Sequence, residues 1–398
     1  MLDFDTARQR LLDAARPIER SESLPLEHAL GRVLAEDARA RAPSPPSHVS
    51  TLDGYAIATR DLAADGETRL RVSQRIAAGQ TGAALRPGES ARIFTGAAVP
   101  PGADAIVAQE ATRREGDAVI FTARPAPFED IRRQGADFEA DAILLPAGTR
   151  LGPAHLGLLA SGGIDRPNVR ERLRVTLLTS GDEVVPAGQP LAPGQIHNAN
   201  APMLHGLLEQ LGCEISHAEH LPDDFDQTRS VLQRVAGECD VILTSGGVSV
   251  GEEDHIKRVV DELGALDLWK VRMKPGKPLA FGQVLGTPFI GLPGNPVSGF
   301  VTFLLFARPF LLARMGADAP PLRPLCLPAA FARPAASDRR EFARARLTAD
   351  QRVELYADQG SGILSSLTWA EALAEIPEHA TIAPGDDVKI YLLAELLA

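Results

Sequence analysis

The sequence has 398 residues, more than one ordinary domain needs, and this length predicts two to four domains. Its hydrophobic and charged fractions, 44% and 23%, are typical of a soluble globular protein. The 52 acidic and 41 basic residues give a net charge of −11, which argues against general nucleic-acid binding. A site for an anion would therefore need a local cluster of positive side chains.

The first 46 residues predict two helices followed by a loop. Residues 4–16 place apolar side chains at helical spacing, and residues 25–37 form a second helical stretch. The N-terminal segment has charges throughout and no apolar core, so we expect no secretory signal. Prolines and serines in residues 41–56 then indicate a loop or linker, and we place a domain boundary near residue 46.

Residues 55–138 change character. Short β-type runs alternate with turn signals such as "RPGE", "PPGAD" and "REGD", a pattern that predicts a compact β-rich module. Helical composition returns briefly near residue 140. We therefore predict a domain of residues 1–46 and 139–172, interrupted by an inserted β-rich domain of residues 47–138.

Residues 173–318 alternate strand and helix, which predicts a doubly wound α/β domain with a parallel sheet. Two of its strands end in the same tripeptide, Thr-Ser-Gly, at residues 179–181 and 244–246. Ligands bind beyond the carboxyl ends of such strands, so both tripeptides should face one crevice. A proline-rich link and further β-type runs predict a C-terminal β domain of residues 319–398, so the predicted fold class is α/β multidomain.

Two features outside these patterns predict packing rather than function. The apolar run at residues 300–312 is broken by Arg308 and Pro309, so we expect a buried helix too short to span a bilayer. The cysteines are widely spaced and form no CxxC or zinc pattern, so we expect reduced packing residues in a cytoplasmic protein. They are Cys213, Cys239 and Cys326.

The segment "TSGGVSVGEEDH", residues 244–255, follows an apolar strand and precedes a helix. Its glycines let backbone N–H groups approach an anion, and the helix adds its positive end. The acids that follow, Asp254 with Glu252 or Glu253, either cap the helix or hold magnesium beside a phosphate. The twin loop "TSGDEVVP" supplies Asp182 and Glu183 from a neighbouring strand end.

The segment "LWKVRMKPGKPLAFG" places Lys270, Arg272 and Lys274 on one face of a strand, and a Pro-Gly turn then presents Lys277. Lysines can protect an exposed edge strand against aggregation, or they can bind an anionic substrate. We favour anion binding, because the following "GLPGNPVSG" forms a third anion-facing turn before a helix. That turn contains Pro293, Asn295, Pro296 and Ser298.

The motifs "STLDGYA", "RIFTGA", "IRRQGADF", "PAGTRL", "TSGDEV", "GQIHNAN", "TSGGVSVGEEDH", "WKVRMKPGKP", "GLPGNPVSG" and "GSGILSS" occur in one order over essentially the whole chain. This order and spacing resemble the molybdopterin molybdotransferases, the family of the enzymatic part of gephyrin. Two departures, Leu52 where Met is usual and Ser180 where Thr is frequent, remove no acid and no lysine.

The resemblance implies that the protein inserts molybdenum from molybdate into adenylylated molybdopterin, with magnesium assisting and AMP released. It also implies four domains, an elongated homodimer, and a working site shared between two chains. As partners it suggests the upstream adenylyltransferase and downstream cofactor-maturation proteins, with no nucleic acid and no membrane.

Site residues follow from the same resemblance. The predicted metal-binding or water-orienting acids are Asp254, Asp224 and Glu183. The predicted clamp for pyrophosphate and molybdate is Lys270, Lys274 and Lys277. The predicted cofactor cradle is Ser180, Gly181, Asp182, Ser245, Gly246, Gly247 and Ser249, with Pro293, Asn295, Pro296 and Ser298 over the end that receives the metal. From the first and second domains Asp53, Thr95 and Asp137 should approach the cleft, and from the last domain Arg344 and Ser361, or Ser365 in its place.

Two alternatives remain at this point. A molybdopterin adenylyltransferase would resemble residues 173–318 alone, and the additional domains argue against it. A scaffold of the gephyrin type is the other, but the chain has no long disordered linker and no attached second enzyme domain.

Overall fold

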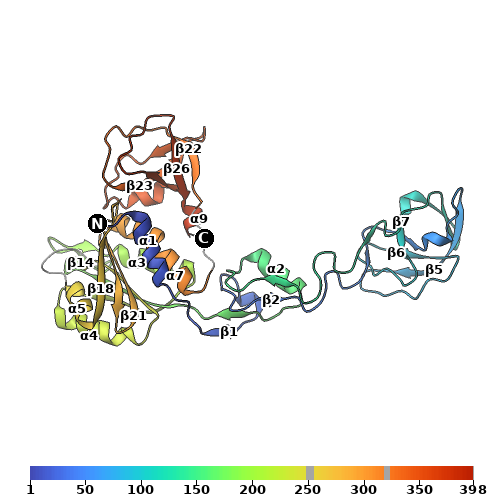
Figure 1. Ribbon diagram of the computed structural model, residues 1–398, viewed down its shortest axis with the longest axis horizontal. Coiled ribbons are helices and arrows are strands. Elements are labelled where there is room, and N and C mark those ends of the chain that lie inside the picture. Colours follow the sequence, from blue (N-terminus) through green and yellow to red (C-terminus); the bar gives the residue numbers. More distant parts are fainter. Residues whose placement is uncertain (248–254, 318–322, 398) are drawn as a thin grey trace. The chain divides into compact units, whose positions relative to one another are not determined.

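The computed structural model describes residues 1–247, 255–317 and 323–397, and the chain divides into two compact units (Figure 1). The first unit comprises Met1–Glu22, Gly31–Ala35 and Val169–Ala398, and the second comprises Ser23–Leu30 and Glu36–Asn168. The chain passes between them at four points. Two lie within the short strands β1 (Ser21–Ser23) and β12 (Asn168–Arg170), and the others follow Leu30 and Ala35. The domain boundaries expected at residues 46, 138, 172 and 318 remain predictions.

A six-stranded sheet forms the centre of the first unit. Its strands, in spatial order, are β16 (Glu214–Leu221), β13 (Arg174–Ser180), β17 (Val241–Ser245), β21 (Thr287–Leu292), β20 (Pro278–Val284) and β18 (Gly264–Lys270). The first four are parallel, as the alternation predicts, but β20 pairs antiparallel with both β21 and β18, so β20 runs against the other five strands. The expectation of a wholly parallel sheet is therefore wrong at one edge. There Leu285 and Gly286, both with positive φ, connect β20 to β21 in a two-residue hairpin.

Helices cover both faces of this sheet, which confirms the doubly wound architecture (Figure 1). Because strand side chains alternate, Leu177 packs with the α3 side and Leu178 with the α4 and α5 side. The covering helices are α1 (Phe4–Ala14) and α3 (Asn200–Leu211) on one face, and α4 (Phe225–Ala236) and α5 (His255–Leu263) on the other. Two short strands, β14 (Val184–Val185) and β15 (Ile196–His197), pair in parallel after β13.

The helix after the third loop runs from Pro296 to Arg314 and is longer than the apolar run suggests. It consists of α6 (Pro296–Thr302), a π-helical segment (Phe303–Ala307) and α7 (Arg308–Arg314). Pro309 cannot donate a backbone hydrogen bond, and the π turn immediately before it accommodates it without ending the helix. These 19 residues are long and apolar enough to cross a membrane, which corrects our estimate of length. However, 78% of the apolar stretch is buried inside the protein, as we expected.

The C-terminal part of the first unit is a second mixed sheet, as predicted. It contains β19 (Met273–Lys274), β23 (Arg340–Leu347), β25 (Ala372–Ile376), β26 (Asp387–Leu392) and β22 (Leu325–Pro328), with β24 (Val353–Leu355) beside β23. Helices α8 (Ser365–Trp369) and α9 (Leu393–Leu397) accompany it. The strand β19 comes from the segment that joins β18 to β20, so this segment contributes to both sheets.

The second unit is rich in β-structure, as predicted. Its six-stranded sheet has the order β7 (Ala105–Ala108), β4 (Gly54–Ile57), β6 (Glu89–Ile93), β5 (Thr68–Ile76), β9 (Ala118–Phe121) and β8 (Thr112–Glu115). The strands β2 (Ala38–Arg39) and β11 (Ile143–Leu145) pair, as do β3 (Val49–Ser50) and β10 (Ile131–Arg132). This unit also contains one helix, α2 (Pro153–Ser161). Its 3₁₀ turns are Thr59–Asp61, Gln109–Ala111 and the turn at Leu26–His28.

The second helix expected near the N-terminus is wrong. Only a 3₁₀ turn forms in residues 25–37, at Leu26–His28. Gly31 follows with φ of +76°, a left-handed conformation that ends a right-handed helical path. Helical spacing of apolar residues was therefore a poor guide in this short segment.

Cys213 and Cys239 are buried thiols, as expected of packing residues. Cys326 differs, because it lies exposed on β22.

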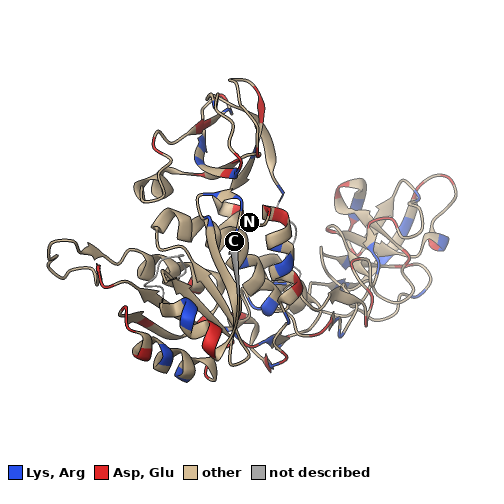
Figure 2. Cartoon of the chain, turned by 60° about the vertical axis from the view of Figure 1, so that its left-hand side comes forward, with Lys and Arg blue, Asp and Glu red and all other residues tan. Residues whose placement is uncertain are grey.

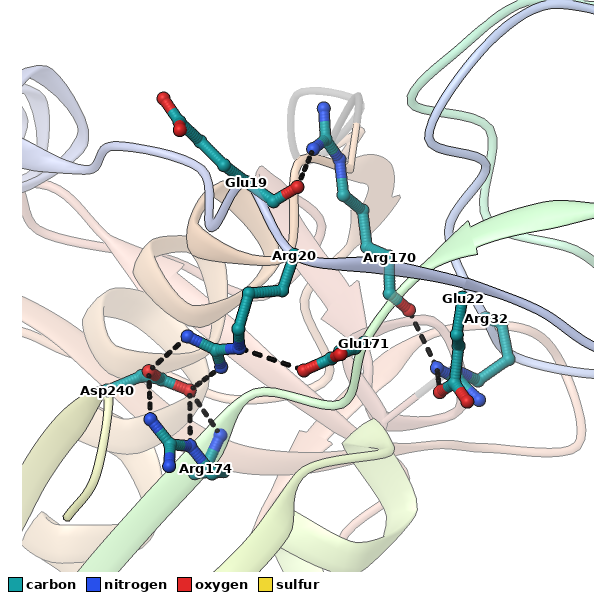
Figure 3. Close-up of polar contacts among 8 residues, drawn as sticks. All are labelled: Glu19, Arg20, Glu22, Arg32, Arg170, Glu171, Arg174 and Asp240. Atoms are coloured by element: carbon teal, nitrogen blue, oxygen red, sulfur yellow. Dashed lines mark hydrogen bonds and ion pairs between the residues drawn. The ribbon is translucent and has the colours of Figure 1, made fainter.

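A buried carboxylate lies at the amino end of the central sheet (Figure 3). The Asp240 side chain is only 7% exposed, and it precedes β17. It accepts hydrogen bonds from the Arg20 guanidinium at 3.1 and 2.7 Å and from the Arg174 backbone N–H at 2.9 Å. Burial alone would raise the pKa of Asp240, but the hydrogen bonds from both arginines outweigh it, and the pKa lies below its usual value.

Candidate functional site

Three loops meet at the carboxyl ends of β13, β17 and β21. Gly246 has φ of +91°, and a Cβ atom on it would lie 2.9 Å from the Ser180 hydroxyl and 3.0 Å from the Ser180 carbonyl oxygen. A Cβ atom on Gly294 would lie 3.6 Å from the Cα atom of Gly246. Only glycine permits this approach at position 246, so the structure brings together the three loops that the repeated tripeptides and the "GLPGNP" motif predict.

Two asparagines fasten these loops. The Asn200 side-chain amide donates to the Ser245 hydroxyl at 2.9 Å and to the Gly294 carbonyl at 2.6 Å. The Asn198 amide donates to the Thr179 hydroxyl at 3.0 Å. Ser245 also donates to the carbonyl of Pro293 at 3.3 Å. The predicted roles of Ser245 and Pro293 thus acquire a physical basis, since a side-chain network holds their loops in register.

Acidic side chains gather on the two outer loops. Asp182 and Asp223 exchange hydrogen bonds, each backbone N–H donating to the other's carboxylate, at 3.3 and 3.0 Å. Glu183 lies against Gly181 and is exposed. Asp224 instead caps α4, because its carboxylate accepts from the Gln227 backbone N–H at 2.7 Å.

Asp224, predicted as a metal-binding or water-orienting acid, therefore makes the contact of a helix cap. The adjacent Asp223 is the residue whose carboxylate meets the neighbouring loop. Asp254 and Ser249, the other predicted members of this set, lie outside the described residues, as do Glu252 and Glu253. Among the residues that are described, no group of three or more His, Cys, Asp or Glu side chains is arranged to hold a metal ion.

A pocket of about 540 Å³ lies between the central sheet and the C-terminal sheet of the same unit. Four cationic side chains line it, with one acid, Asp358. They are Lys274, Lys277, Arg333 and Arg339. Asn295 and Ser298, at the beginning of α6, line it as well, so the positive end of a helix also faces the cavity. Such a lining favours a compact anion.

The Glu341 carboxylate orients two of these cations. It is 7% exposed, and it lies 3.4 Å from the Lys274 ammonium and 3.1 Å from the Arg333 guanidinium. Gly276, with φ of +100°, makes the turn to Lys277, and a Cβ atom there would lie 2.3 Å from the Thr302 hydroxyl. The turn needs glycine because helix α6 packs directly against it.

Of the residues predicted in the C-terminal region, Ser361 lines the pocket and Arg344 supports its wall from behind. Ser361 lines the pocket, and its carbonyl accepts from the Val297 backbone N–H at 3.1 Å. Ser365 does not line it and lies 3.3 Å from the Tyr356 hydroxyl, so the structure favours Ser361 of the two alternatives. Arg344 is 1% exposed and donates to the carbonyls of Asp358 and Gly360 at 3.4 and 3.0 Å. It lies behind the pocket and supports the loop rather than forming the wall.

Not all predicted residues of the first unit face the pocket. Lys270 ends β18 and is exposed, and it does not line the cavity that Lys274 and Lys277 share. Pro296 is the first residue of α6, where its missing N–H costs no helical hydrogen bond. Gly247, with φ of +65°, packs against Ile256, so any side chain there would be strained.

Of the three predicted residues in the second unit, Asp53 and Thr95 are hydrogen-bonded to each other, whereas Asp137 makes a different contact. The Asp53 carboxylate accepts from the Thr95 backbone N–H at 2.9 Å and from the Thr95 hydroxyl at 2.8 Å. These bonds hold the pKa of Asp53 below its usual value. Asp137 is exposed, and its backbone N–H donates to the Ser44 carbonyl.

Comparison with known proteins covers nearly the whole chain. Residues 2–163 match the "MoeA N-terminal region (domain I and II)", residues 176–313 a "Probable molybdopterin binding domain", and residues 327–393 the "MoeA C-terminal region (domain IV)". The molybdopterin molybdenumtransferase 2 of Mycobacterium tuberculosis is 36% identical over 96% of both chains. The molybdopterin molybdenumtransferase of Haemophilus influenzae is 38% identical over 79% of this chain and 78% of its own. The chain belongs to the molybdopterin molybdenumtransferase family.

A solved structure supports the same assignment. The molybdopterin biosynthesis protein of Pyrococcus horikoshii superposes with a TM-score of 0.86 at 30% identity, covering 98% of this chain and 100% of its own. The molybdenumtransferase interpretation is thereby favoured over both alternatives, adenylyltransferase and scaffold. The family resemblance and the α/β multidomain fold class are confirmed.

Sequence reasoning missed several residues of this candidate site. Arg333 and Arg339 stand in a proline- and arginine-rich segment with no strand periodicity, and only the tertiary fold brings them to Lys274. Asn198 and Asn200 belong to the "GQIHNAN" motif. Two side-chain amides directly after a strand could have indicated residues that hydrogen-bond to neighbouring loops. Asp223 was visible as the neighbour of Asp224.

Proposed function

We propose that this protein transfers molybdenum from molybdate to adenylylated molybdopterin and releases AMP. The observation that carries the proposal is the pocket lined by four cationic side chains next to the beginning of α6. Molybdate is a compact dianion, and such an ion is held by charge-assisted hydrogen bonds from lysine and arginine. In a chain of net charge −11, these four side chains form a local positive cluster.

The described residues suggest a division of labour. The glycine-lined loops at Ser180, Gly246 and Gly294 offer backbone groups to the phosphates of the substrate. Lys274 and Lys277 balance the charge that develops as the phosphoanhydride bond breaks. Molybdenum bonds to the two dithiolene sulfurs while one molybdate oxygen leaves as water with the two thiol protons. A water molecule attacks the adenylyl phosphorus, so the adenylyl group leaves as AMP.

Magnesium is part of the proposal. Its holders would be Glu183 and Asp182, with Asp223 beside them and Asp254 from outside the described residues. Carboxylate oxygens suit a hard cation, and none of the three described acids pairs with a lysine or arginine among the described residues. When bound, magnesium would neutralise charge on the phosphates.

The test is AMP release by the purified protein with adenylylated molybdopterin, molybdate and magnesium. We expect AMP only when all three are present, and a chelator should abolish the reaction. AMP release that needs neither molybdate nor magnesium would contradict the proposal. Adenylyl transfer from ATP to free molybdopterin would instead identify an adenylyltransferase.

The Asp254→Asn variant is a second test, directed at the proposed magnesium site. An amide can still cap a helix but is a poor magnesium ligand, so the variant should stay folded and lose catalysis. Full turnover at ordinary magnesium concentrations would reduce Asp254 to a helix cap.

We also propose a homodimer whose working site is shared between chains, with Asp53 and Thr95 from one and the anion loops from the other. This rests on the family resemblance and on the isologous interface of a two-fold dimer, which would make two equivalent sites. Asp53→Asn chains mixed with Asp254→Asn chains should then regain about a quarter of wild-type activity, because roughly half of randomly mixed dimers are heterodimers with one intact site. No recovery despite demonstrated subunit exchange would contradict the shared site.

A cytoplasmic location and contacts with the enzymes before and after this step are also proposed. They follow from the chemistry, since a labile adenylylated substrate is best passed directly between proteins. Co-purification of the upstream adenylyltransferase with a tagged form of this chain would test the contact.

A further inference from the structure

Arg92 is a charged residue of the second unit to which the proposed function gives no role. It lies on β6, three residues before Thr95, and begins the "RIFTGA" motif. Its guanidinium carbon lies 4.5 Å from the centre of the Phe94 ring and 5.3 Å from that of the Tyr55 ring. Because a guanidinium is attracted to the face of an aromatic ring, these contacts hold the side chain beside the end of β6.

The Arg92 guanidinium joins the backbone next to Asp53 to the backbone next to Thr95. Its Nη1 donates to the Gly54 carbonyl at 2.8 Å and to the Ile93 carbonyl at 3.3 Å. Gly54 directly follows Asp53, and Ile93 stands two residues before Thr95. One side chain therefore links the two segments that carry the hydrogen-bonded pair of Asp53 and Thr95.

Gln109 completes this support. The Arg92 Nη2 donates to the side-chain oxygen of Gln109, and the backbone N–H of Gln109 donates to the Asp53 carbonyl at 3.1 Å. The Asp53 backbone is thus held at its own carbonyl by Gln109 and at the next carbonyl by Arg92. Thr95 holds the carboxylate itself, so both the backbone and the side chain of the acid are fixed.

The charge of Arg92 is not used in an ion pair among the described residues. Its cross-strand partner on β5 is a second cation, Arg75, and like charges on adjacent strands repel each other. The positive charge acts on Asp53 instead. Hydrogen bonds from Thr95 lower the pKa of Asp53 most, and the charge of Arg92 lowers it further. Arg92 therefore favours the ionised form of the acid.

We propose that Arg92 is a positioning residue, whose hydrogen bonds hold Asp53 and Thr95 in the arrangement that turnover requires. The inference rests on the proposed function, because it applies only if Asp53 belongs to the working site. A guanidinium suits this task, since its donors lie in one rigid plane and reach three acceptors at once. A lysine ammonium would keep the charge but could not reproduce this geometry.

The test is molybdate-dependent AMP release by Arg92→Met, which removes the charge and the donors but keeps an unbranched apolar side chain. We expect kcat to fall about 10- to 100-fold with little change in KM, because displacement of a working group by about 1 Å can cost about 10²-fold in rate. The matched control is Arg75→Met. Arg75 also lies over Phe94, at 4.4 Å, but no hydrogen bond from its side chain is found among the described residues, so the control should keep the wild-type kcat.

The pH profile of kcat separates positioning from a general loss of structure. Without the charge of Arg92 the pKa of Asp53 rises, so the acid limb of the profile should move to higher pH in Arg92→Met. The other charged group near Asp53 is Glu110, which every variant retains. Arg92→Lys keeps the charge, so it should keep the wild-type acid limb and recover only part of the lost kcat.

Three results would overturn the inference. They are a folded Arg92→Met with wild-type kcat, equal losses in Arg92→Met and Arg75→Met, and a loss in Arg92→Met with an unmoved acid limb. If Arg92→Met fails to fold, Arg92→Lys decides, and a wild-type kcat in that variant overturns the inference. A wild type that releases no AMP overturns the proposed function and this inference with it, whereas the results above, with an active wild type, overturn the inference alone.

Discussion

The two ends of the central sheet use charge in opposite ways. At the amino end, Asp240 is buried and its oxygens are occupied by Arg20 and Arg174 (Figure 3). At the carboxyl end, Asp182 and Glu183 are exposed, and no ion pair to either is found among the described residues. Acidic and basic segments are interspersed elsewhere in the chain (Figure 2). For these acids, the comparison teaches that a carboxylate paired with arginines holds the fold, whereas Asp182 and Glu183, without such a pair among the described residues, are available to a cationic ligand.

The strongest test of the carboxyl end is Glu183→Gln. It should lower turnover about 10²- to 10⁴-fold, or roughly 3–5 kcal/mol in activation free energy, because an essential acidic group is neutralised. Its free energy of unfolding should change by no more than about 0.5 kcal/mol, since the side chain is exposed. Turnover and urea denaturation measure the two effects. A variant that keeps activity within threefold of the wild type would contradict the proposed role of the acids at the carboxyl end of the sheet.

At the amino end, Asp240→Ala should have the reverse profile. Two arginines lose their common acceptor, and breaking a buried ion pair costs about 3–5 kcal/mol of unfolding free energy. Asp165→Ala is the control, because the exposed pair of Asp165 with Arg41 should contribute at most about 1 kcal/mol. Urea denaturation compares them. Equal losses in the two variants would show that burial of Asp240 is unimportant.

Lys274→Ala tests the cationic pocket, and the expected loss of binding free energy is of intermediate size. Loss of a charged hydrogen bond should weaken molybdate binding by about 1.5–3 kcal/mol, roughly 10- to 100-fold. The control is Lys389→Ala, an exposed lysine on β26 away from the pocket lining, which should bind molybdate as before. Calorimetric titration measures both. Unchanged affinity together with a large loss of melting temperature would make Lys274 structural, through its contact with Glu341.

The smallest expected effect is on pH dependence. The pKa of Asp240 is lowered in the folded protein, so its contribution to stability is complete above the unfolded value, about 3.9, and is lost as pH falls through the lower folded value. The wild type should therefore lose stability below about pH 4 more steeply than Asp240→Ala does. Denaturation midpoints between pH 2 and 6 would show this. Parallel curves would mean that other carboxylates dominate.

Much of this architecture was predictable because its signals are local. The strands and helices of residues 174–263 follow from apolar periodicity, and the glycine-rich loops from their position after apolar strands. The choice between Asp223 and Asp224 was not predictable, because one residue decides which carboxylate caps α4 and which turns to the neighbouring loop.

Contacts between residues far apart in the chain could not be predicted from the sequence, for a different reason. Strand alternation placed Lys270 and Lys274 on one face, but the chain leaves the central sheet between them, so only Lys274 reaches the pocket. Arg333 and Arg339 join it from a segment some sixty residues later in the chain, which no period could reveal.

The two-residue strand β19 has a consequence for how this protein could be divided or recombined. Met273 and Lys274 belong by sequence to the α/β region but pair with Arg340 and Glu341 of the C-terminal sheet. A chimera joined at the proline-rich link near residue 320 would therefore separate a strand from its partner and a pocket lysine from Glu341. A chimera that takes residues 271–277 from the same parent as the C-terminal sheet would keep both contacts.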